Sequence, residues 1–430
     1  MRTFKYISLI ILTTIIWTAF IGYGFIDGFL LKPITSKNTS EAFIEATKEK
    51  IDDEVVGNFA MTLIENGKTS KNFFYSIDKP VNKNTIFPVA SISKWVTAFG
   101  VLKLVEQGKL DLDKPVDDYI TRWHLPESKF DNKKVTVRKL LSHSSGLVDD
   151  LGYDGFAPNE TVQTIEESLT KASDAGNSDG VAIVGYKPGS QYMYSGAGYT
   201  ILQLLIEEIS GQSFQEYMTR EVFEPLKMEN STFVLTEKPN VQLAQIYKDD
   251  GTTRQPNKFT ALAAASLFTS IADLSKFLEA NISSNPVLSQ ETIAKMSEPQ
   301  TFINDIGVYG LGPHLYSQND QTSNIIGHDG SGNNAINTAA RIDLISKNGI
   351  IILETGNHDI ASGLSDEWIF WKAGISDYVV MQRNRSYILT LLIIGYVIII
   401  LLSVIIIRKK NKKRRTTVGN INSIAELVVK

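Results

Sequence analysis

The stretch of sequence that decides the fold reads FPVASISKWVT over residues 87–97. It places Ser91 and Lys94 three residues apart, after an extended apolar run and at the start of an apolar helical pattern. Residues three apart in a helix lie on one face, so the lysine ammonium can reach the serine hydroxyl. An ammonium one turn away can lower its neighbour's pKa or, when desolvated, accept its proton. The pattern therefore predicts a serine nucleophile that is activated without histidine.

The same Ser-x-x-Lys spacing also occurs at Ser76 and at Ser168. Ser76 lies in a strand-like run that ends before Pro80, and Ser168 lies in a polar stretch typical of a solvated surface. A serine that caps a surface helix is the ordinary explanation of such a match. Ser91 differs because apolar residues stand on both sides of it, so we interpret Ser91 as the functional serine.

Composition excludes several classes of function. The chain has 430 residues, of which 43% are apolar and 21% charged, as in ordinary globular proteins. It has no cysteine, which excludes disulfides, cysteine catalysis and iron–sulfur clusters. Its five histidines show no metal-ligand spacing, and no phosphate-binding glycine loop occurs. We therefore expect neither a metal nor an organic cofactor.

Two apolar runs, residues 6–26 and 387–407, are each about as long as a membrane-spanning helix. Arg2 and Lys5 precede the first run, and eight basic residues against one acidic residue follow the second. Because basic flanks favour the cytoplasmic side, residues 1–5 and 408–430 are both expected in the cytoplasm. The first run could be a cleaved signal peptide, but its length and the lack of a small-residue cleavage site favour an uncleaved anchor.

The segment between the two runs is acidic, since the whole chain has a net charge of −4 despite its basic ends. This argues against nucleic acid as a partner. It suits substrates that carry an amine, although solubility would explain it equally well. We expect a linker at residues 27–40 and an extracellular folded domain at residues 41–380; the oligomeric state stays open.

Strand-like and helical patterns alternate within that domain. Residues 58–64 and 72–77 read as a hairpin around Glu-Asn-Gly-Lys, and residues 93–107 as a helix. Further helices are expected at 198–209 and 212–222, and strands at 323–326, 335–342 and 349–354. Strands at both ends with helices between them predict an α/β domain with an antiparallel sheet.

A Ser/Lys site also needs a proton carrier and donors for an oxyanion. Tyr194 stands in the glycine-rich segment YMYSGAGY, residues 192–199. A nearby ammonium lowers the pKa of a phenol, so Tyr194 is a credible general base. His328 lies in GHDGSG, residues 327–332, which follows a predicted strand and offers backbone N–H groups. Taken singly, Tyr194 could be packing and His328 a surface residue; His143 is interpreted as a structural loop histidine.

In order along the chain, these segments resemble the penicillin-binding, class C β-lactamase-like serine hydrolases. The matching pieces are Ser91-x-x-Lys94, the turn LLSHSSGL at 140–147, Tyr194-Ser195-Gly196, the segment 267–277 and His328-Asp329-Gly330. The resemblance implies an α/β (α+β) fold with a central antiparallel sheet flanked by helices, an all-helical subdomain and two terminal transmembrane helices.

The resemblance also implies roles for individual residues. Ser91 would be acylated, and Lys94 and Tyr194 would together carry out the proton transfers. His328 would replace the third-motif cation or hydrogen-bond donor. The oxyanion and substrate would be held by Gly330, Gly196 and Ser331, with the backbone N–H groups of Ser91 and Ser331 forming the oxyanion hole.

Two features of the motifs bear on the substrate, of which only the first departs from the family pattern. Gly196 stands where relatives often have asparagine, and the third motif has histidine rather than lysine. We therefore expect a membrane-tethered hydrolase of D-amino-acyl amides or esters, from the cell envelope or from peptide antibiotics. The alternatives are a catalytically silent ligand-binding or scaffolding protein and a true β-lactamase.

Overall fold

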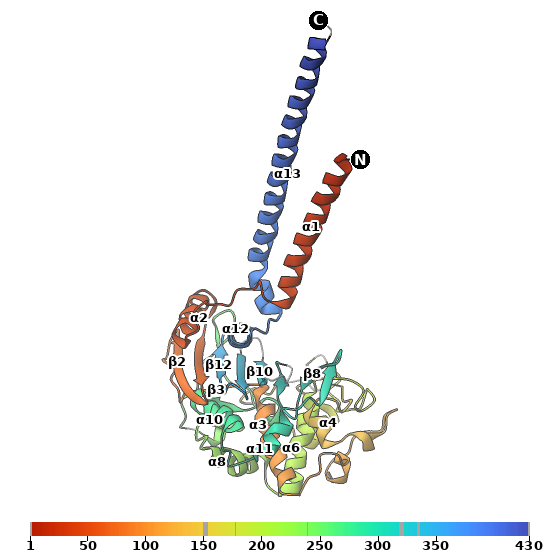
Figure 1. Ribbon diagram of the computed structural model, residues 1–430. Helices are drawn as coiled ribbons and strands as arrows, with labels where there is room; N and C mark the ends of the chain where they lie inside the picture. The colour runs from red at the N-terminus through yellow and green to blue at the C-terminus, as the bar shows by residue number, and fades with distance from the viewer. Residues whose placement is uncertain are drawn as a thin grey trace. The chain divides into compact units, whose positions relative to one another are not determined.

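The computed structural model describes residues 2–148, 154–176, 178–238, 240–317, 322–332 and 336–428. Within these ranges the chain forms two compact units, which are described separately below. One unit is Lys37–Trp368, and the other combines Met1–Ser36 with Ile369–Lys430. Figure 1 shows the α/β unit and the pair of long helices.

An antiparallel sheet forms the centre of the α/β unit. Its eight strands, as far as the chain is described, follow the order β2-β1-β12-β11-β10-β9-β8-β7. They are β1 (Asn58–Glu65), β2 (Lys68–Ser76), β7 (Thr301–Ile303), β8 (Ile306–Tyr309), β9 (His314–Leu315), β10 (Ile325–Gly332), β11 (Ile336–Asp343) and β12 (Gly349–Thr355). Two short pairs lie outside it: β3 (Ile86–Pro88) with β6 (Phe268–Ser270), and β4 (Ile246–Tyr247) with β5 (Thr253–Arg254).

Strands from both ends of the domain meet in this sheet, as the sequence predicted. β1 pairs with β12 over seven residues, beginning with Asn58 opposite Thr355. The predicted hairpin is also present. Its turn residues Asn66 and Gly67 have φ values of 51° and 78°, the left-handed conformation that a tight hairpin turn requires. β2 begins earlier than predicted because its pairing with β1 continues up to this turn.

Helices cover both faces of the sheet. The main ones in the unit are α2 (Ser40–Glu54), α3 (Ile92–Glu106), α6 (Gly196–Ser210), α10 (Ile271–Ile282) and α12 (Ile360–Ala373). Shorter helical segments are α4 (Val137–Leu141), α5 (Ile165–Lys171), α7 (Phe214–Met218), α8 (Glu224–Leu226), α9 (Leu262–Ala265), α11 (Gln290–Met296), η1 (Val116–Asp118), η2 (Asn132–Lys134), η3 (Thr219–Phe223) and η4 (Leu235–Glu237). α3 and α10 contact one face of the sheet. On the other face, Ser362 of α12 forms hydrogen bonds with Asn337 of β11.

The core lies between the sheet and α3. Trp95 and Phe99 of α3 are fully buried and both contact the ring of Phe277 in α10. Alternate residues of the strands, such as Leu353 and Ala340, complete this core. Burying a large apolar side chain contributes about 1.5–3 kcal/mol. The helix that begins at Ser91 is therefore fixed by many such contacts, and it cannot shift without disrupting them.

The position of His328 differs from the expectation that its segment follows a strand. It lies inside β10, which continues to Gly332 and pairs with β11 along its whole length. The glycines in the segment suggested an end to the strand. The strand nevertheless continues through these glycines. Gly330 is needed within it because this residue passes close to the backbone of Val89, where a side chain would not fit.

The second unit contains two long apolar helices, α1 (Arg2–Asp27) and α13 (Tyr378–Val428). Lys5–Asp27 and Tyr378–Lys410 are each long and apolar enough to cross a membrane. The helices run antiparallel, since Tyr6 contacts Lys410 while Trp17 lies beside Leu392. Thr18 and Tyr396 share a hydrogen bond of 2.7 Å between them. Gly395 leaves space for the Trp17 indole, which a Cβ atom would occupy.

We predict that buried Glu354 makes the α/β unit less stable as the pH rises. Burial raises the pKa of Glu354 to about 8, so the folded chain keeps it protonated where the unfolded chain ionises it. Stability should fall between the unfolded pKa and about pH 8, by at most ~1.4 kcal/mol per pH unit. Thermal unfolding of the detergent-solubilised chain should show E354Q more stable than wild type at about pH 8, with a smaller difference near pH 5. E237Q at an exposed position is the control, and a pH-independent difference for E354Q would contradict the prediction.

We also predict opposite outcomes for two glycines of β10. A Cβ atom at Gly330 would collide with the Val89 carbonyl and the Thr338 hydroxyl, whereas at Gly332 the nearest atom is 3.8 Å away. G330A should lower the free energy of unfolding by about 1–3 kcal/mol. G332A should change it by less than about 0.5 kcal/mol. Denaturant unfolding of both variants measures this, and equal effects would show that β10 is not tightly packed on the segment before α3.

Candidate active site

Ser91 stands at the junction between a short strand and helix α3. Strand β3 ends at Pro88, and the Val89 N–H then donates to the Leu267 carbonyl at 2.9 Å. Ala90 has a φ of 45°, a left-handed conformation that is strained for a residue with a side chain. This sharp turn places Ser91 at the N-cap of α3, where its side chain makes no capping hydrogen bond. The hydroxyl is therefore not used to stabilise the helix.

Lys94 reaches the serine hydroxyl from the first turn of α3. Its Nζ lies 3.2 Å from Ser91 Oγ and donates to the Ala264 carbonyl at 2.8 Å. The side chain is only 2% exposed, and its Nζ lies 4.8 Å from the centre of the Tyr194 ring. Carbonyl oxygens and aromatic faces are the neutral groups that stabilise a buried cation. The predicted Ser/Lys/Tyr set is thus assembled in one place.

Tyr194 is held by an interaction between two loops. Ser195, the N-cap of α6, donates its backbone N–H to His143 Nδ1 at 3.0 Å, and the Met193 N–H donates to the His143 carbonyl at 2.8 Å. The rings of His143 and Tyr194 lie 4.3 Å apart. Burial, together with the charge of Lys94, keeps the pKa of His143 well below its usual value, so the imidazole is neutral. His143 therefore has backbone partners, as a structural loop histidine should, and it orients the predicted proton carrier.

His328 is buried, and both of its ring nitrogens contact neighbouring groups. Nδ1 lies 2.6 Å from the Asp329 carbonyl, which can only accept, so Nδ1 carries the proton. Nε2 then accepts from the Tyr309 hydroxyl at 2.9 Å. Burial lowers the pKa of His328 well below its usual value, and Lys94 adds to this effect. The imidazole that takes the place of the third-motif cation or hydrogen-bond donor is thus neutral, and both of its nitrogens are bonded within the protein.

The remaining predicted residues lie along β10 and at the start of α6. Gly330 packs on Val89, directly before the Ala90-Ser91 turn, and Ser331 is exposed. β10 pairs with β9 only at Ile326 and Gly327, so its edge beyond them carries no paired strand among the described residues. Gly196 is the first residue of α6 and has no side chain to offer a ligand.

Sequence reasoning missed three residues that surround this site. Tyr309 bonds to His328, and His314 of β9 has its ring 4.8 Å from the His328 ring. Arg341 of β11 is fully buried and pairs with Asp329 at 2.6 Å and Asp366 at 3.4 Å. None of them stands in a segment with a recognisable motif. The only signal for Tyr309 and His314 is that histidine and tyrosine are frequent between residues 309 and 328, and Arg341 has no such signal.

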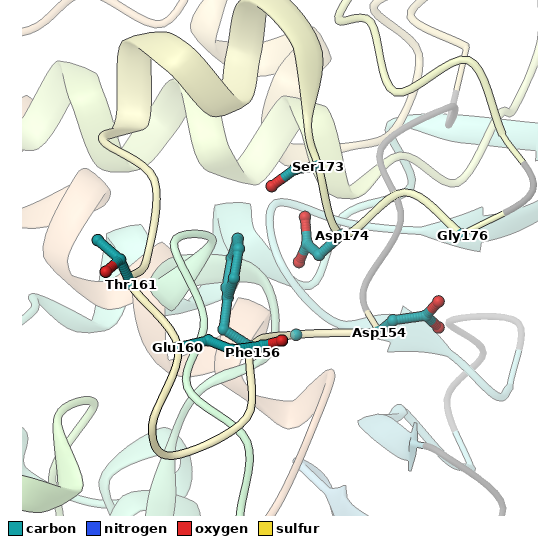
Figure 2. Close-up of a pocket in the computed structure, with 8 residues that line it drawn as sticks. Asp154, Phe156, Glu160, Thr161, Ser173, Asp174 and Gly176 are labelled. Carbon is teal, nitrogen blue, oxygen red and sulfur yellow. The ribbon is translucent and has the colours of Figure 1, made fainter.

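Other residues of the α/β unit form a hollow. Figure 2 shows Asp154, Phe156, Glu160 and Asp174 among those that line it. Burial raises the pKa of Asp174. In the part of the chain that the structure describes, no three ligating side chains are grouped so as to hold a metal ion. We assign no function to this hollow.

Comparisons with known proteins agree with the fold. Protein flp of Staphylococcus aureus (strain MW2) is 26% identical over 292 residues, which cover 63% of this chain and 54% of that protein. The putative penicillin-binding protein PbpX of Bacillus subtilis (strain 168) is 28% identical over 260 residues, covering 58% and 60%. The chain thus spans little more than half the length of these curated relatives.

Solved structures show the same architecture. The octameric penicillin-binding protein homologue from Pyrococcus abyssi has a TM-score of 0.63 and 27% identity, covering 78% of this chain and 77% of that one. A D-stereospecific amidohydrolase from Streptomyces sp. has a TM-score of 0.59 and 19% identity, covering 78% and 99%, and is similar in fold. A sequence model of the Beta-lactamase family matches residues 45–373. Because this match covers most of the chain and the fold agrees with it, the chain belongs to the Beta-lactamase family, a superfamily of serine hydrolases.

Proposed function

We propose that this chain is a membrane-tethered serine hydrolase that forms an acyl-enzyme at Ser91. Its substrates would be D-amino-acyl amides or esters of the cell envelope or of peptide antibiotics. The observation that carries the proposal is the 3.2 Å contact between Lys94 Nζ and Ser91 Oγ, made by a lysine that is almost inaccessible to water. A buried ammonium beside a hydroxyl lowers the pKa of that hydroxyl and of a neighbouring phenol, an arrangement that can activate a serine without histidine.

Acylation would begin when Ser91 Oγ attacks the substrate carbonyl carbon. The serine proton passes to the Lys94 and Tyr194 pair, in which Lys94 Nζ lies 4.8 Å from the centre of the Tyr194 ring. The negative oxygen of the tetrahedral intermediate would accept hydrogen bonds from the Ser91 and Ser331 backbone N–H groups. When the intermediate collapses, the bond to the leaving group breaks and Tyr194 returns the proton to that group. The acyl chain then remains attached to Ser91.

Deacylation would use the same groups in reverse. A water molecule takes the place of the leaving group beside Tyr194, which removes its proton as the water oxygen attacks the acyl carbon. The second tetrahedral intermediate collapses, the acid product leaves, and Ser91 Oγ recovers its proton. No step needs a metal or an organic cofactor.

The surroundings of His328 favour an esterase or peptidase over a β-lactamase. A substrate carboxylate is best held by a cation. His328 is neutral, its two nitrogens are bonded to Asp329 and Tyr309, and Arg341 is buried between two aspartates. Gly196 offers no amide for the acyl chain. Relatives named as penicillin-binding proteins support a ligand of the penicillin kind, but we expect such a ligand to be captured slowly.

We therefore expect the wild-type chain to hydrolyse a D-alanyl ester with a higher kcat/KM than a chromogenic cephalosporin. S91A should lower ester hydrolysis by at least about 10³-fold, because the covalent route is lost. It should also abolish labelling by a fluorophosphonate probe, followed by mass spectrometry of the intact protein. Ser93, which is fully buried, supplies the control S93A, which should still be labelled.

Other outcomes of this experiment would support the alternatives. Efficient cephalosporin turnover would identify a true β-lactamase. Absence of labelling and of turnover in the wild type would indicate a silent ligand-binding protein. Labelling that persists in S91A would contradict the assignment of the nucleophile.

We further propose that residues 6–26 and 387–407 span the cell membrane, with both termini cytoplasmic and residues 41–380 outside. The antiparallel pairing of α1 and α13 supports this topology, because it leaves both chain ends at the same end of the helix pair (Figure 1). The basic residues that follow Ile407 would stay on the cytoplasmic side, near anionic headgroups.

Protease treatment of protoplasts tests this topology. The protease should remove the domain that contains Ser91 and spare a tag placed after Lys430, because the membrane protects the cytoplasmic side. Lysed protoplasts, in which both parts are accessible, are the control. A tag that is digested in intact protoplasts, or a domain that survives there, would contradict the proposed orientation.

A further inference from the structure

His314 is part of the wall of the Ser91 site, although no sequence motif includes it. It belongs to β9 and pairs with Gly327 of β10 and Tyr309 of β8. Its ring lies nearly parallel to the Tyr194 ring, at an interplanar angle of 14° and a centroid distance of 6.2 Å. The rings of Tyr309 and His328 are closer still, at 4.6 and 4.8 Å. The position of His314 is thus fixed by three of the residues that form the site.

His314 differs from the other two histidines of the site in its hydrogen bonding. His328 uses both ring nitrogens within the protein, and His143 uses Nδ1. The backbone of His314 pairs in the sheet, but its imidazole makes no hydrogen bond to any described residue, and the side chain is partly exposed. A donor and an acceptor are therefore available to a ligand beside Tyr194.

The charge of His314 restricts which ligand it can bind. Burial lowers the pKa of His314 to about 4. The negative charge of Asp329 acts to raise this pKa, whereas the positive charges of Arg341 and Lys94 lower it further. The ring is therefore neutral at pH 7 and attracts a carboxylate no more than His328 does. A hydroxyl group, which both donates and accepts, matches a neutral imidazole better than an ion does.

We propose that His314 determines specificity for the leaving group, by hydrogen bonding to a hydroxyl of a polyhydroxylated leaving alcohol. This rests on the proposed function, in which Tyr194 protonates the leaving group. A group protonated by Tyr194 must lie against that side chain, and His314 borders the same space. The substrate class is therefore a D-amino-acyl ester of a polyol, in preference to an amide whose leaving group carries a carboxylate.

The test compares two esters that differ only in the hydroxyls of the leaving alcohol, D-alanyl glycerol ester and D-alanyl propyl ester. For the wild-type full chain in detergent, kcat/KM should be higher for the glycerol ester. H314F keeps an aromatic ring but removes both nitrogens, and should reduce this preference by about tenfold, the effect of one hydrogen bond. Hydrolysis of the propyl ester, which offers no hydroxyl to lose, should fall less in H314F than hydrolysis of the glycerol ester. H314Q, which retains a donor and an acceptor, should keep most of the preference.

Two controls separate specificity from folding and from the chemistry. H314L should lose the preference as H314F does, and H124F, at a 62% exposed side chain, should keep it. Fluorophosphonate labelling of Ser91 should persist in every variant. An unchanged preference in H314F, or an equal loss for both esters, would overturn the inference while the proposed function stands. A wild type that hydrolyses neither ester would contradict the proposed function and the inference together.

Discussion

The buried ammonium of Lys94 is the constraint to which the rest of the site is adjusted. A cation removed from water is costly unless neighbouring groups replace its hydration. The Ala264 carbonyl, the Ser91 hydroxyl and the faces of Tyr194 and Tyr199 do so here. The same charge disfavours further cations nearby. Burial is the main cause of the lowered pKa values of His143, His314 and His328, and the Lys94 charge lowers them further, so three imidazoles stay neutral around one ammonium.

Neutral histidines act by position and hydrogen bonding rather than by charge. His143 fastens the loop that carries Tyr194 to the loop after α4, and His328 orders Tyr309. The buried cation Arg341 is balanced by Asp329 and Asp366. A site built in this way provides a precise arrangement of proton carriers but no free cation in the third motif. For this reason we favour esters with neutral leaving groups over substrates that the protein would have to bind through the substrate's own carboxylate.

The parts of this site that could be predicted from sequence are those with a local signal. Ser91 and Lys94 are one helical turn apart, so their proximity follows from the helix alone. Tyr194 and His328 were found because glycine-rich segments surround them. His314 and Tyr309 could not be found in this way, since they join the site only through the pairing of β8, β9 and β10. The hydrogen bonds of His328 could not be predicted either, because one of them comes from a tyrosine of another strand. The sheet was foreseen in outline, but β10 continues through glycines that suggested its end.

The left-handed conformation of Ala90 has a consequence for how this protein can evolve. A residue with a Cβ atom in this region is destabilised by roughly 1–2 kcal/mol, and glycine would remove most of that strain. Glycine would also give the turn before Ser91 more freedom in the unfolded and folded chain alike. Selection for a more stable fold and selection for a fixed nucleophile therefore act in opposite directions at this position. A family member that has replaced this alanine by glycine should have gained stability at the expense of turnover.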